Sequence, residues 1–422
     1  MIGIEWFDEK IRNDYVGINN DINDYVPRID SIVPKIEDDL KVEISNFPGD
    51  IAILFMENGT VSSKKIQSFL NLSFSQIEKE PALKAYIERC SLISKLLKNI
   101  NKESYIKWFK KNSKKTISDY LDEQFDEYNK KYTAYPLSYP KNATSTKWDH
   151  NFKKSIVKTV LSEPYDKVFD YGKIGYKTRH ILMDSLNIPV CPFCNRQYIT
   201  SWEDMKKEKK STADLDHFFP KSEYPLFALS LFNFVPSCQV CNSRMKLDHF
   251  MDDDGNRPIY PYEEKFDDSV LFKASISEPR KKAMELLEVW LGENTNALKI
   301  ELDYRQNNNQ KLCKYQKQVK RSIELYHLEE VYQAHKSYVS DLMLKKRIYD
   351  DGEYLKGLQS IFESFATETF DVDSDDMIYK LINSDICITH KQLEAFLYGF
   401  NWEKGQDKTR PLSKLAYDIL KR

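Results

Sequence analysis

Two cysteine pairs bracket the stretch of sequence that decides the fold: Cys191-Pro-Phe-Cys194 and, farther along the chain, Cys238-Gln-Val-Cys241. Each Cys-x-x-Cys pair forms a turn that brings two thiolates to one metal ion, and a second pair completes a tetrahedral shell. Four thiolates leave no open position, so we expect a Zn²⁺ ion that folds this segment and takes no part in catalysis. A redox-active pair and four buried thiols are the alternatives, and two pairs in one short segment favour zinc over both.

The residues between and after the pairs include side chains that can ligate a metal ion or accept a proton. Asp216-His217 lies on an expected strand, Pro220 and Asn233 follow, and Asn242 comes directly after the last cysteine. Hydrolysis of a phosphodiester needs a deprotonated water and relief of the charge that develops on the leaving oxygen. A neutral histidine accepts a proton near pH 7. A divalent ion held by hard oxygen ligands supplies the second requirement.

In this order and spacing the residues resemble an HNH endonuclease, the ββα-metal fold in its zinc-framed branch, which includes McrA-like nucleases and the phage resolvase endonuclease VII. The resemblance covers the segment from Cys191 to Lys246. It implies that Asp216 and Asn242 ligate a catalytic Mg²⁺ or Mn²⁺ ion. It also implies that His217 is the general base and that Asn233 holds the loop that orients it.

The resemblance makes two further structural demands. Consecutive strand residues point to opposite faces, so Asp216 and His217 reach one ion only if the strand carries a local bulge. We therefore expect a bulge there. Arg244 and Lys246 lie within one helical turn of Asn242, and we expect both to meet the scissile phosphate. Asn242 and Lys246 share a helix face by their i, i+4 spacing. The family's products carry 5′-phosphate and 3′-hydroxyl ends.

The rest of the chain indicates a mainly α protein with an embedded small α+β module: the ββα-metal core framed by the four-cysteine zinc site. Gly contributes 12 of 422 residues, about 3% against a typical ~7%, which argues against turn-rich β folds and glycine-loop Rossmann enzymes. We expect a helical N-terminal region over 1–140. The nuclease module spans 141–264, with its core at 188–250. A mostly helical C-terminal region with a short strand pair covers 265–422.

Local patterns predict several elements. Apolar residues recur at helical spacing over 92–100. The apolar run 51–56 is compatible with a buried strand or a short helix, and periodicity does not decide between them. Alternation predicts strands at 270–275 and 298–302. Steps of three and four residues over 325–342 predict one long amphipathic helix.

The charges are segregated, although the net charge of the chain is only −2. Residues 91–116 hold eight lysines and one acid, and residues 305–321 hold six basic residues and no acid. Such stripes fit a phosphate backbone, with a solvated helix face as the alternative. Residues 350–376 carry nine acids and one lysine and fit a linker, a partner face or a regulatory flap. The nucleic-acid candidates in the second stripe are Lys311, Lys314 and Lys317.

The chain shows no apolar run long enough for a membrane span, because the longest covers only 51–56. The first residues lack the basic and apolar regions of a signal peptide, so we expect a cytoplasmic protein without a membrane partner. Cysteines in that compartment stay reduced. We interpret the isolated Cys90, Cys313 and Cys387 as core residues.

The leading hypothesis is a metal-dependent HNH endonuclease that acts on DNA. The segment Pro220–Pro225 also resembles HNH subunits of ATPase-coupled antiphage systems such as Septu. That resemblance implies a role in antiphage defence and regulation by an ATPase partner, since the chain itself has no Walker-type glycine loop. The alternative is a non-catalytic, zinc-stabilised nucleic-acid-binding or adaptor protein. The sequence does not indicate an oligomeric state.

Overall fold

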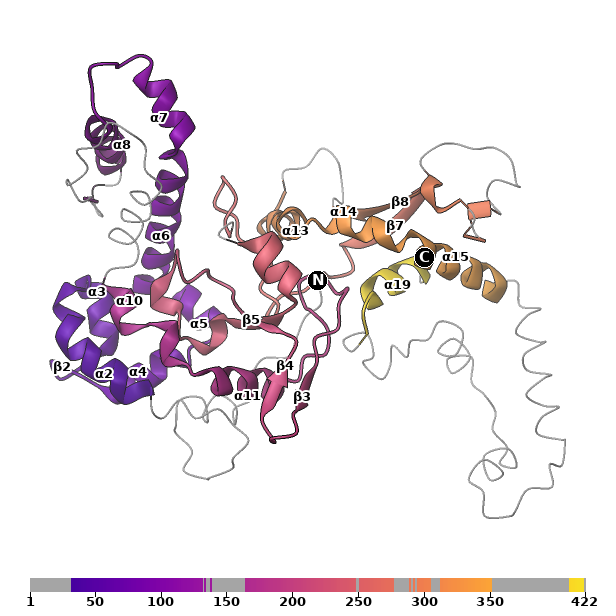
Figure 1. The fold of residues 1–422 in the computed structure, drawn as a ribbon, viewed down its shortest axis with the longest axis horizontal. Coiled ribbons are helices and arrows are strands. Elements are labelled where there is room, and N and C mark those ends of the chain that lie inside the picture. The colour runs from indigo at the N-terminus through magenta and orange to yellow at the C-terminus, as the bar shows by residue number, and fades with distance from the viewer. Residues whose placement is uncertain are drawn as a thin grey trace. The chain divides into compact units, whose positions relative to one another are not determined.

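The computed structural model describes residues 32–131, 133, 137–138, 164–247, 250–276, 288–289, 291–292, 294–304, 312–350 and 410–420. These residues are largely helical and carry four small antiparallel sheets of two strands each (Figure 1), which confirms the mainly α class. Contacts divide the chain into two compact units. Of the described residues, one unit combines 189–198 with those from 264 onward, and the other holds those up to 188 together with 199–263. The three-part division at 140 and 264 stays a prediction.

Helices dominate the first part of the unit that ends at 263. The predicted helix at 92–100 is confirmed as the last part of α6 (Pro81–Asn99), which ends at Asn99. Pro81 stands in its first turn, where a missing N–H costs nothing. Leu83, Ile93 and Leu97 are buried along one face of α6. The other helices of this unit are α2 (Ile32–Glu43), α3 (Gly49–Ala52), α4 (Ser63–Leu70), α5 (Phe74–Lys79), α7 (Lys102–Phe109), α8 (Ile117–Lys131), α10 (Tyr165–Val168) and α11 (Tyr176–Leu186).

The apolar run 51–56 is mostly helical. It begins in α3, continues as the 3₁₀ turn η2 (Ile53–Phe55) and ends in strand β1 (Met56–Glu57). A tight turn at Asn58-Gly59 leads to β2 (Thr60–Val61), and both turn residues have positive φ angles, of 50° and 77°. Asn-Gly favours the two-residue hairpin turn that needs such angles.

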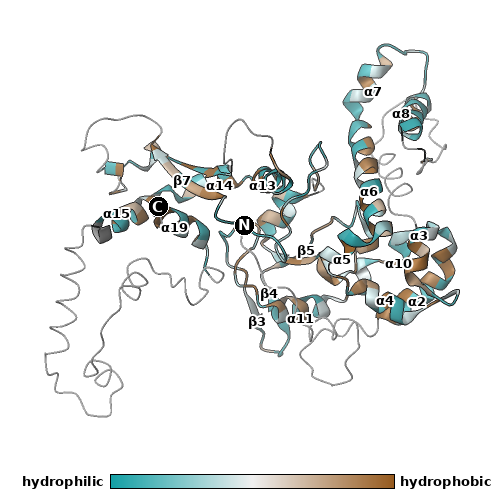
Figure 2. Ribbon diagram, turned by 180° about the vertical axis from the view of Figure 1, so that it is seen from behind, coloured by the Kyte–Doolittle hydropathy of each residue, from teal (hydrophilic) through white to brown (hydrophobic). Residues whose placement is uncertain are grey.

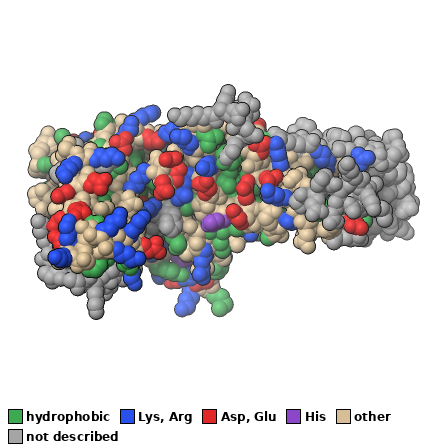
Figure 3. Space-filling model, turned by 90° about the horizontal axis from the view of Figure 1, so that it is seen from above, with side chains coloured by type: hydrophobic (Ala, Val, Ile, Leu, Met, Phe, Trp, Pro, Cys, Tyr) green, Lys and Arg blue, Asp and Glu red, His purple; other side chains and the backbone are tan. Residues whose placement is uncertain are grey.

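The lysine-rich segment 91–116 runs from the end of α6 through α7 to the start of α8. Asn101 caps α7 by accepting a hydrogen bond from the Ser104 backbone N–H at 2.9 Å. The α7 residue Trp108 donates to Glu123 of α8 at 2.7 Å, which ties the two helices together. Lys107, Lys110 and Lys111 are exposed. Acidic and basic side chains are interspersed over the face seen in Figure 3.

An aromatic core forms mostly from side chains of the loop between strands β5 (Asp214–His217) and β6 (Phe234–Ser237). Its side chains are almost fully buried, and their rings pack mostly in edge-to-face and tilted pairs. Each such pair stabilises a core by about 0.5–1.5 kcal/mol more than the burial of its apolar surface alone. The aromatic residues are Phe74, Phe218, Phe219, Tyr224, Phe227, Phe232, Phe250 and Tyr260.

A second hairpin, β3 (Ser201–Glu203) with β4 (Lys209–Ser211), packs on α11.

The other unit contains the predicted strand pair. Strands β7 (Leu271–Ile276) and β8 (Leu298–Asp303) form a six-residue antiparallel ladder, which confirms the strands expected at 270–275 and 298–302. The helices of this unit are α13 (Lys314–Leu325), α14 (Leu328–Tyr332), α15 (Lys336–Asp350) and α19 (Ser413–Leu420).

The single long helix predicted over 325–342 is wrong. Leu325 ends α13, and His327 adopts a left-handed φ of 46° before α14 begins. A 3₁₀ turn at Gln333–His335 then separates α14 from α15. The Gln333 side chain explains this second break, because its amide accepts from Ile300 N at 3.2 Å and donates to Ile300 O at 2.6 Å on β8.

The described helices alternate hydrophilic and hydrophobic stretches (Figure 2). In the described part of the chain, no helix is both long enough and apolar enough to cross a membrane. Cys90 is buried as expected, whereas Cys313 is exposed at the start of α13, so its interpretation as a core residue is wrong. Its backbone N–H donates to the side-chain oxygen of Gln316 at 3.0 Å at the start of the helix. Cys387, residues 305–311 and all but the first residue of 350–376 lie outside the described residues.

Candidate active site

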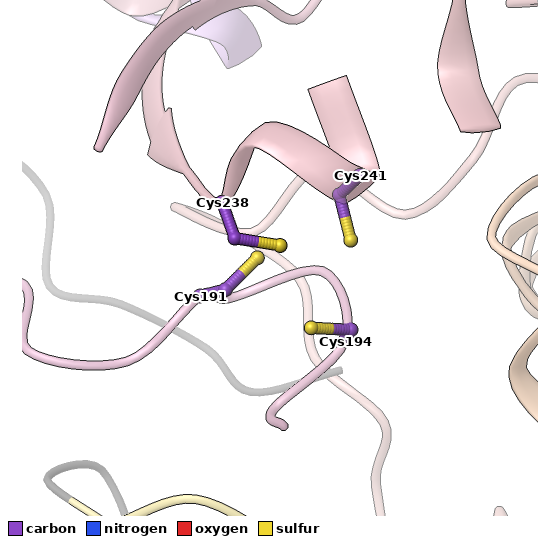
Figure 4. A group of neighbouring side chains, drawn as sticks. All are labelled: Cys191, Cys194, Cys238 and Cys241. Carbon is purple, nitrogen blue, oxygen red and sulfur yellow. The ribbon is translucent and has the colours of Figure 1, made fainter. Parts of the chain in front are cut away.

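The four cysteines of the two pairs converge on one space. Their Sγ atoms all lie within 4.8 Å of one another, and they point towards a common centre (Figure 4). A tetrahedral zinc ion with bonds of ~2.3 Å holds its sulfur ligands about 3.8 Å apart. The cluster could therefore hold a structural metal such as zinc, as predicted. A redox role would need only one pair, so convergence of both favours a metal. The residues are Cys191, Cys194, Cys238 and Cys241, all buried.

Backbone hydrogen bonds shape both thiol turns. The Asn195 N–H donates to the Cys191 carbonyl at 2.9 Å, and the Cys191 N–H donates to the Gln197 carbonyl at 3.0 Å. Asn195 takes a left-handed φ of 50°, which asparagine tolerates better than most residues. In the second turn, the Asn242 N–H donates to the Cys238 carbonyl at 3.1 Å. In each turn the chain reverses sharply enough for two thiols to face the same point.

Among the residues that the structure describes, this is the one group of three or more Cys, His, Asp or Glu side chains positioned to share an ion. The expected catalytic ion has a different donor set, because an asparagine oxygen supplements its carboxylates. The donors of such a site would come from the hairpin of β5 and β6 and from the helical segment that begins at Cys241.

Strands β5 and β6 form a regular hairpin ahead of the π-helical segment η7 (Cys241–Lys246). The ladder runs one residue against one, from Asp214 opposite Ser237 to His217 opposite Phe234. No residue of β5 is left over to form a bulge, so the bulge expected at Asp216-His217 is wrong. The two side chains consequently lie on opposite faces of the strand.

Asp216 forms a buried ion pair with Lys246. The Lys246 Nζ lies 2.8 Å and 2.7 Å from the two carboxylate oxygens of Asp216, and it also donates to the backbone carbonyl of His217. The two side chains are only 5% and 2% exposed. Burial raises the pKa of Asp216 and lowers that of Lys246, while their mutual attraction opposes both changes. Lys246 is thus packed inside the protein and not at the surface position expected for a phosphate ligand.

Asn242 contacts Asp214, one of the neighbours that sequence reasoning missed. The Asn242 amide donates to a carboxylate oxygen of Asp214 at 3.0 Å, and the Ser243 hydroxyl lies 3.3 Å from the same oxygen. Asp214 and Asp216 share a face of β5 because they are two residues apart on a strand. That spacing was the available signal. Asn242 and Lys246 both face this side of β5, as their spacing predicts.

His217 is buried on the opposite face of β5. Its Nε2 lies 3.0 Å from the Ala228 carbonyl, which only accepts hydrogen bonds. Nε2 therefore carries the proton, and Nδ1 is left with a free lone pair in the neutral ring. Burial is the main cause that lowers the pKa of His217 to about 3, and nearby lysine and arginine charges act in the same direction. The imidazole is consequently neutral at pH 7, with one nitrogen able to accept a proton.

Asn233 ties the loop between the two strands to itself. Its amide donates to the carbonyls of Phe219 and Phe227, both at 3.0 Å, and its oxygen accepts from the Phe219 N–H at 2.6 Å. The side chain is fully buried. Because Ala228 follows Phe227 directly, this clamp fixes the carbonyl that orients His217.

The remaining nucleic-acid candidates are distributed over both units. Arg244 is exposed on η7, in the same unit as the hairpin. Lys314 is exposed and Lys317 half-buried on α13, in the other unit. Lys311 lies outside the described residues.

One curated relative shares part of this sequence. The protein "ea31" of Escherichia phage lambda is 35% identical over 75 residues, which are 18% of this chain and 21% of that protein. The chain thus spans about a fifth of the length of this relative. No family model matches the chain. No solved structure matches it either.

Proposed function

We propose that the chain is a metal-dependent HNH endonuclease that hydrolyses phosphodiester bonds of DNA. The proposal is supported by the order of elements: thiol turn, strand β5, strand β6, second thiol turn and helical segment η7. This order is compatible with the ββα arrangement framed by four cysteines that the resemblance implies. The observation that carries the proposal is the neutral, oriented imidazole of His217, because a general base needs a free nitrogen at neutral pH.

In this proposal His217 accepts a proton at Nδ1 from the attacking water. The Ala228 carbonyl keeps the opposite nitrogen protonated, and Asn233 holds the loop in place. Burial keeps the ring neutral at pH 7, and the same lowering of its pKa weakens it as a base, because a general base works best when its pKa lies near the operating pH.

The face of β5 that carries Asp214 and Asp216 supplies oxygen donors of the kind that Mg²⁺ or Mn²⁺ prefers, and Asn242 adds an amide oxygen. In this structure Lys246 bonds both Asp216 oxygens and the Asn242 amide faces Asp214 through its nitrogen, so a hard divalent ion would have to displace these contacts. When bound there, the ion would neutralise charge on the leaving oxygen. Lys246 now neutralises Asp216, so the ammonium and a divalent ion compete for the same carboxylate.

The test is cleavage of supercoiled plasmid by the purified full chain with Mg²⁺ or Mn²⁺. We expect nicking by the parent and none by His217→Ala. The matched control is His327→Asn, because His327 is exposed on the other unit and asparagine tolerates its left-handed backbone. Equal cleavage by the parent and His217→Ala would contradict the proposal. So would a bound-metal measurement that finds no zinc in the parent.

A second candidate is a zinc-stabilised nucleic-acid-binding or adaptor protein without catalysis. The occupied carboxylate of Asp216 favours this reading, because Lys246 satisfies both of its oxygens without any ion. This candidate predicts that DNA retention by His217→Ala equals that of the parent and that Mg²⁺ changes nothing. Regulation by an ATPase partner and a role in antiphage defence accompany the nuclease proposal, and both rest on the resemblance of residues 220–225.

A further inference from the structure

Two cations pack against one tyrosine ring beside His217. The guanidinium carbon of Arg179 lies 4.0 Å from the centroid of the Tyr171 ring, and the Lys221 Nζ lies 4.5 Å from it. The same ring meets the His217 imidazole edge-on, with 4.6 Å between the ring centroids. Tyr171 comes from the 3₁₀ turn η4 (Tyr171–Lys173), Arg179 from α11 and Lys221 from the loop after β5. All four residues belong to one compact unit.

The backbone holds the guanidinium in place. Arg179 donates from Nε to the Ile174 carbonyl at 3.0 Å and from one terminal nitrogen to the Tyr171 carbonyl at 3.2 Å. These two bonds use two of the five N–H groups of an arginine, so others are available to a ligand. Lys221 is exposed, and Tyr171 and Arg179 are half-buried. The group is therefore anchored at one end and open to solvent at the other.

Among the described residues, no carboxylate lies within ion-pair distance of Arg179 or Lys221. Burial and the Arg179 charge lower the pKa of Lys221, and Asp170 opposes this effect only in part. Two like charges on one ring repel each other. An anion between or beside them would relieve that repulsion.

We infer that Arg179 and Lys221 form an anion subsite that binds a backbone phosphate of nucleic acid on the His217 face of β5. The inference rests on the proposed function for the identity of the ligand. A planar guanidinium offers paired donors to phosphate oxygens, and an ammonium adds a point charge. Tyr171 spaces the two cations and packs against the imidazole, so a phosphate bound by them lies near the proposed base.

The test measures binding of a fluorescein-labelled 20-base-pair DNA duplex by the zinc-loaded full chain, by fluorescence anisotropy without added Mg²⁺. The variants are Lys221→Gln, Arg179→Lys and Arg179→Gln. The matched control is Lys206→Gln, an exposed lysine of the β3–β4 turn that removes the same charge. Circular dichroism of every variant checks that it is folded.

We expect Lys221→Gln to raise the Kd about fivefold to tenfold and to reduce the slope of log Kd against log salt by about one, as loss of one phosphate contact does. Arg179→Lys keeps the charge but loses the paired donors, so its Kd should fall between those of the parent and Arg179→Gln. Lys206→Gln should stay within twofold of the parent.

Unchanged affinity and salt slope in Lys221→Gln and Arg179→Gln would overturn the subsite, and so would a parent that does not bind the duplex at low salt. These outcomes are separable from failure of the nuclease proposal. A parent that cleaves plasmid while Lys221→Gln binds normally refutes the subsite alone. A parent that binds through Lys221 but never cleaves refutes the nuclease and leaves the subsite standing.

Discussion

Replacement of Lys246 by methionine should destabilise the fold strongly. Methionine keeps the length of the side chain but leaves the Asp216 carboxylate buried, at 5% exposure, without its cation. Removal of one partner from a buried ion pair costs about 3–5 kcal/mol. Protonation limits the loss: neutralising a carboxyl with an ordinary pKa of about 3.9 at pH 7 costs about 4 kcal/mol. We therefore expect the free energy of unfolding to fall by about 4 kcal/mol.

The assay is urea unfolding of the zinc-loaded chain followed by circular dichroism. The sign of the pH dependence follows from burial, which raises the pKa of this carboxyl in the folded state. An acid whose folded pKa is raised destabilises the fold above its unfolded pKa and stops doing so at lower pH. The deficit of Lys246→Met should therefore shrink by about 1.4 kcal/mol for each pH unit between pH 7 and pH 5.

The control is the double variant Asp216→Asn/Lys246→Met, which removes the charge together with its partner. It should recover most of the lost stability, because no uncompensated charge remains. A loss below about 1 kcal/mol in Lys246→Met would refute the buried pair. An equal loss in the Asp216→Asn background would refute it too, since the lysine would then act without the carboxylate.

Three other perturbations test the frame of the site. Cys241→Ser should lower the zinc content below one ion per chain and lower the thermal midpoint of unfolding, because a structural ion adds its binding energy to folding. Unchanged zinc content by mass spectrometry would contradict this. Asn233→Ala removes three buried hydrogen bonds and should cost roughly 2–4 kcal/mol in urea unfolding; a loss under 1 kcal/mol would contradict the clamp. Burial lowers the pKa of His217 to about 3, so the unfolded chain binds its proton first as the pH falls below 6.5. The parent should therefore lose about 2 kcal/mol more than His217→Phe between pH 7 and pH 5, and equal losses would show that the imidazole is not buried.

Local patterns predicted the elements whose own residues carry a periodic or spaced signal. The helical spacing at the end of α6 and the Cys-x-x-Cys turns depend on contacts within a few residues. The alternation of β7 and β8 identified each strand, although their ladder joins residues far apart in the sequence. The break between α13 and α15 escaped prediction because it depends on distant contacts. Gln333, in the 3₁₀ turn between α14 and α15, pairs with the backbone of Ile300, more than thirty positions earlier in the sequence. The spacing of apolar and polar residues in the local sequence does not indicate such a distant partner.

The site was predictable as a set of residues but not as a set of pairs. The sequence identified Asp216, Asn242 and Lys246, and the structure pairs Asp216 with Lys246 and Asn242 with Asp214. Which carboxylate Asn242 and Lys246 each reach depends on how far η7 advances along β5. The wider turns of a π-helix change that advance. One part of this arrangement follows from elementary strand geometry. Residues two positions apart on a strand share a face, which places Asp214 and Asp216 together.

The regular alternation of β5 also constrains how a substrate would meet the site. Asp216 faces η7, and His217 faces the ring of Tyr171 on the other side of the strand. A single phosphodiester that met both side chains would have to lie across an edge or the end of β5. Strand β6 covers one edge, and in the described sheet of two strands the other edge carries no partner. Arg179 and Lys221 lie on the His217 side, so they would hold the backbone just beyond that crossing. Damage from Lys221→Gln should therefore fall mainly on substrate binding, whereas damage from His217→Ala should fall on turnover.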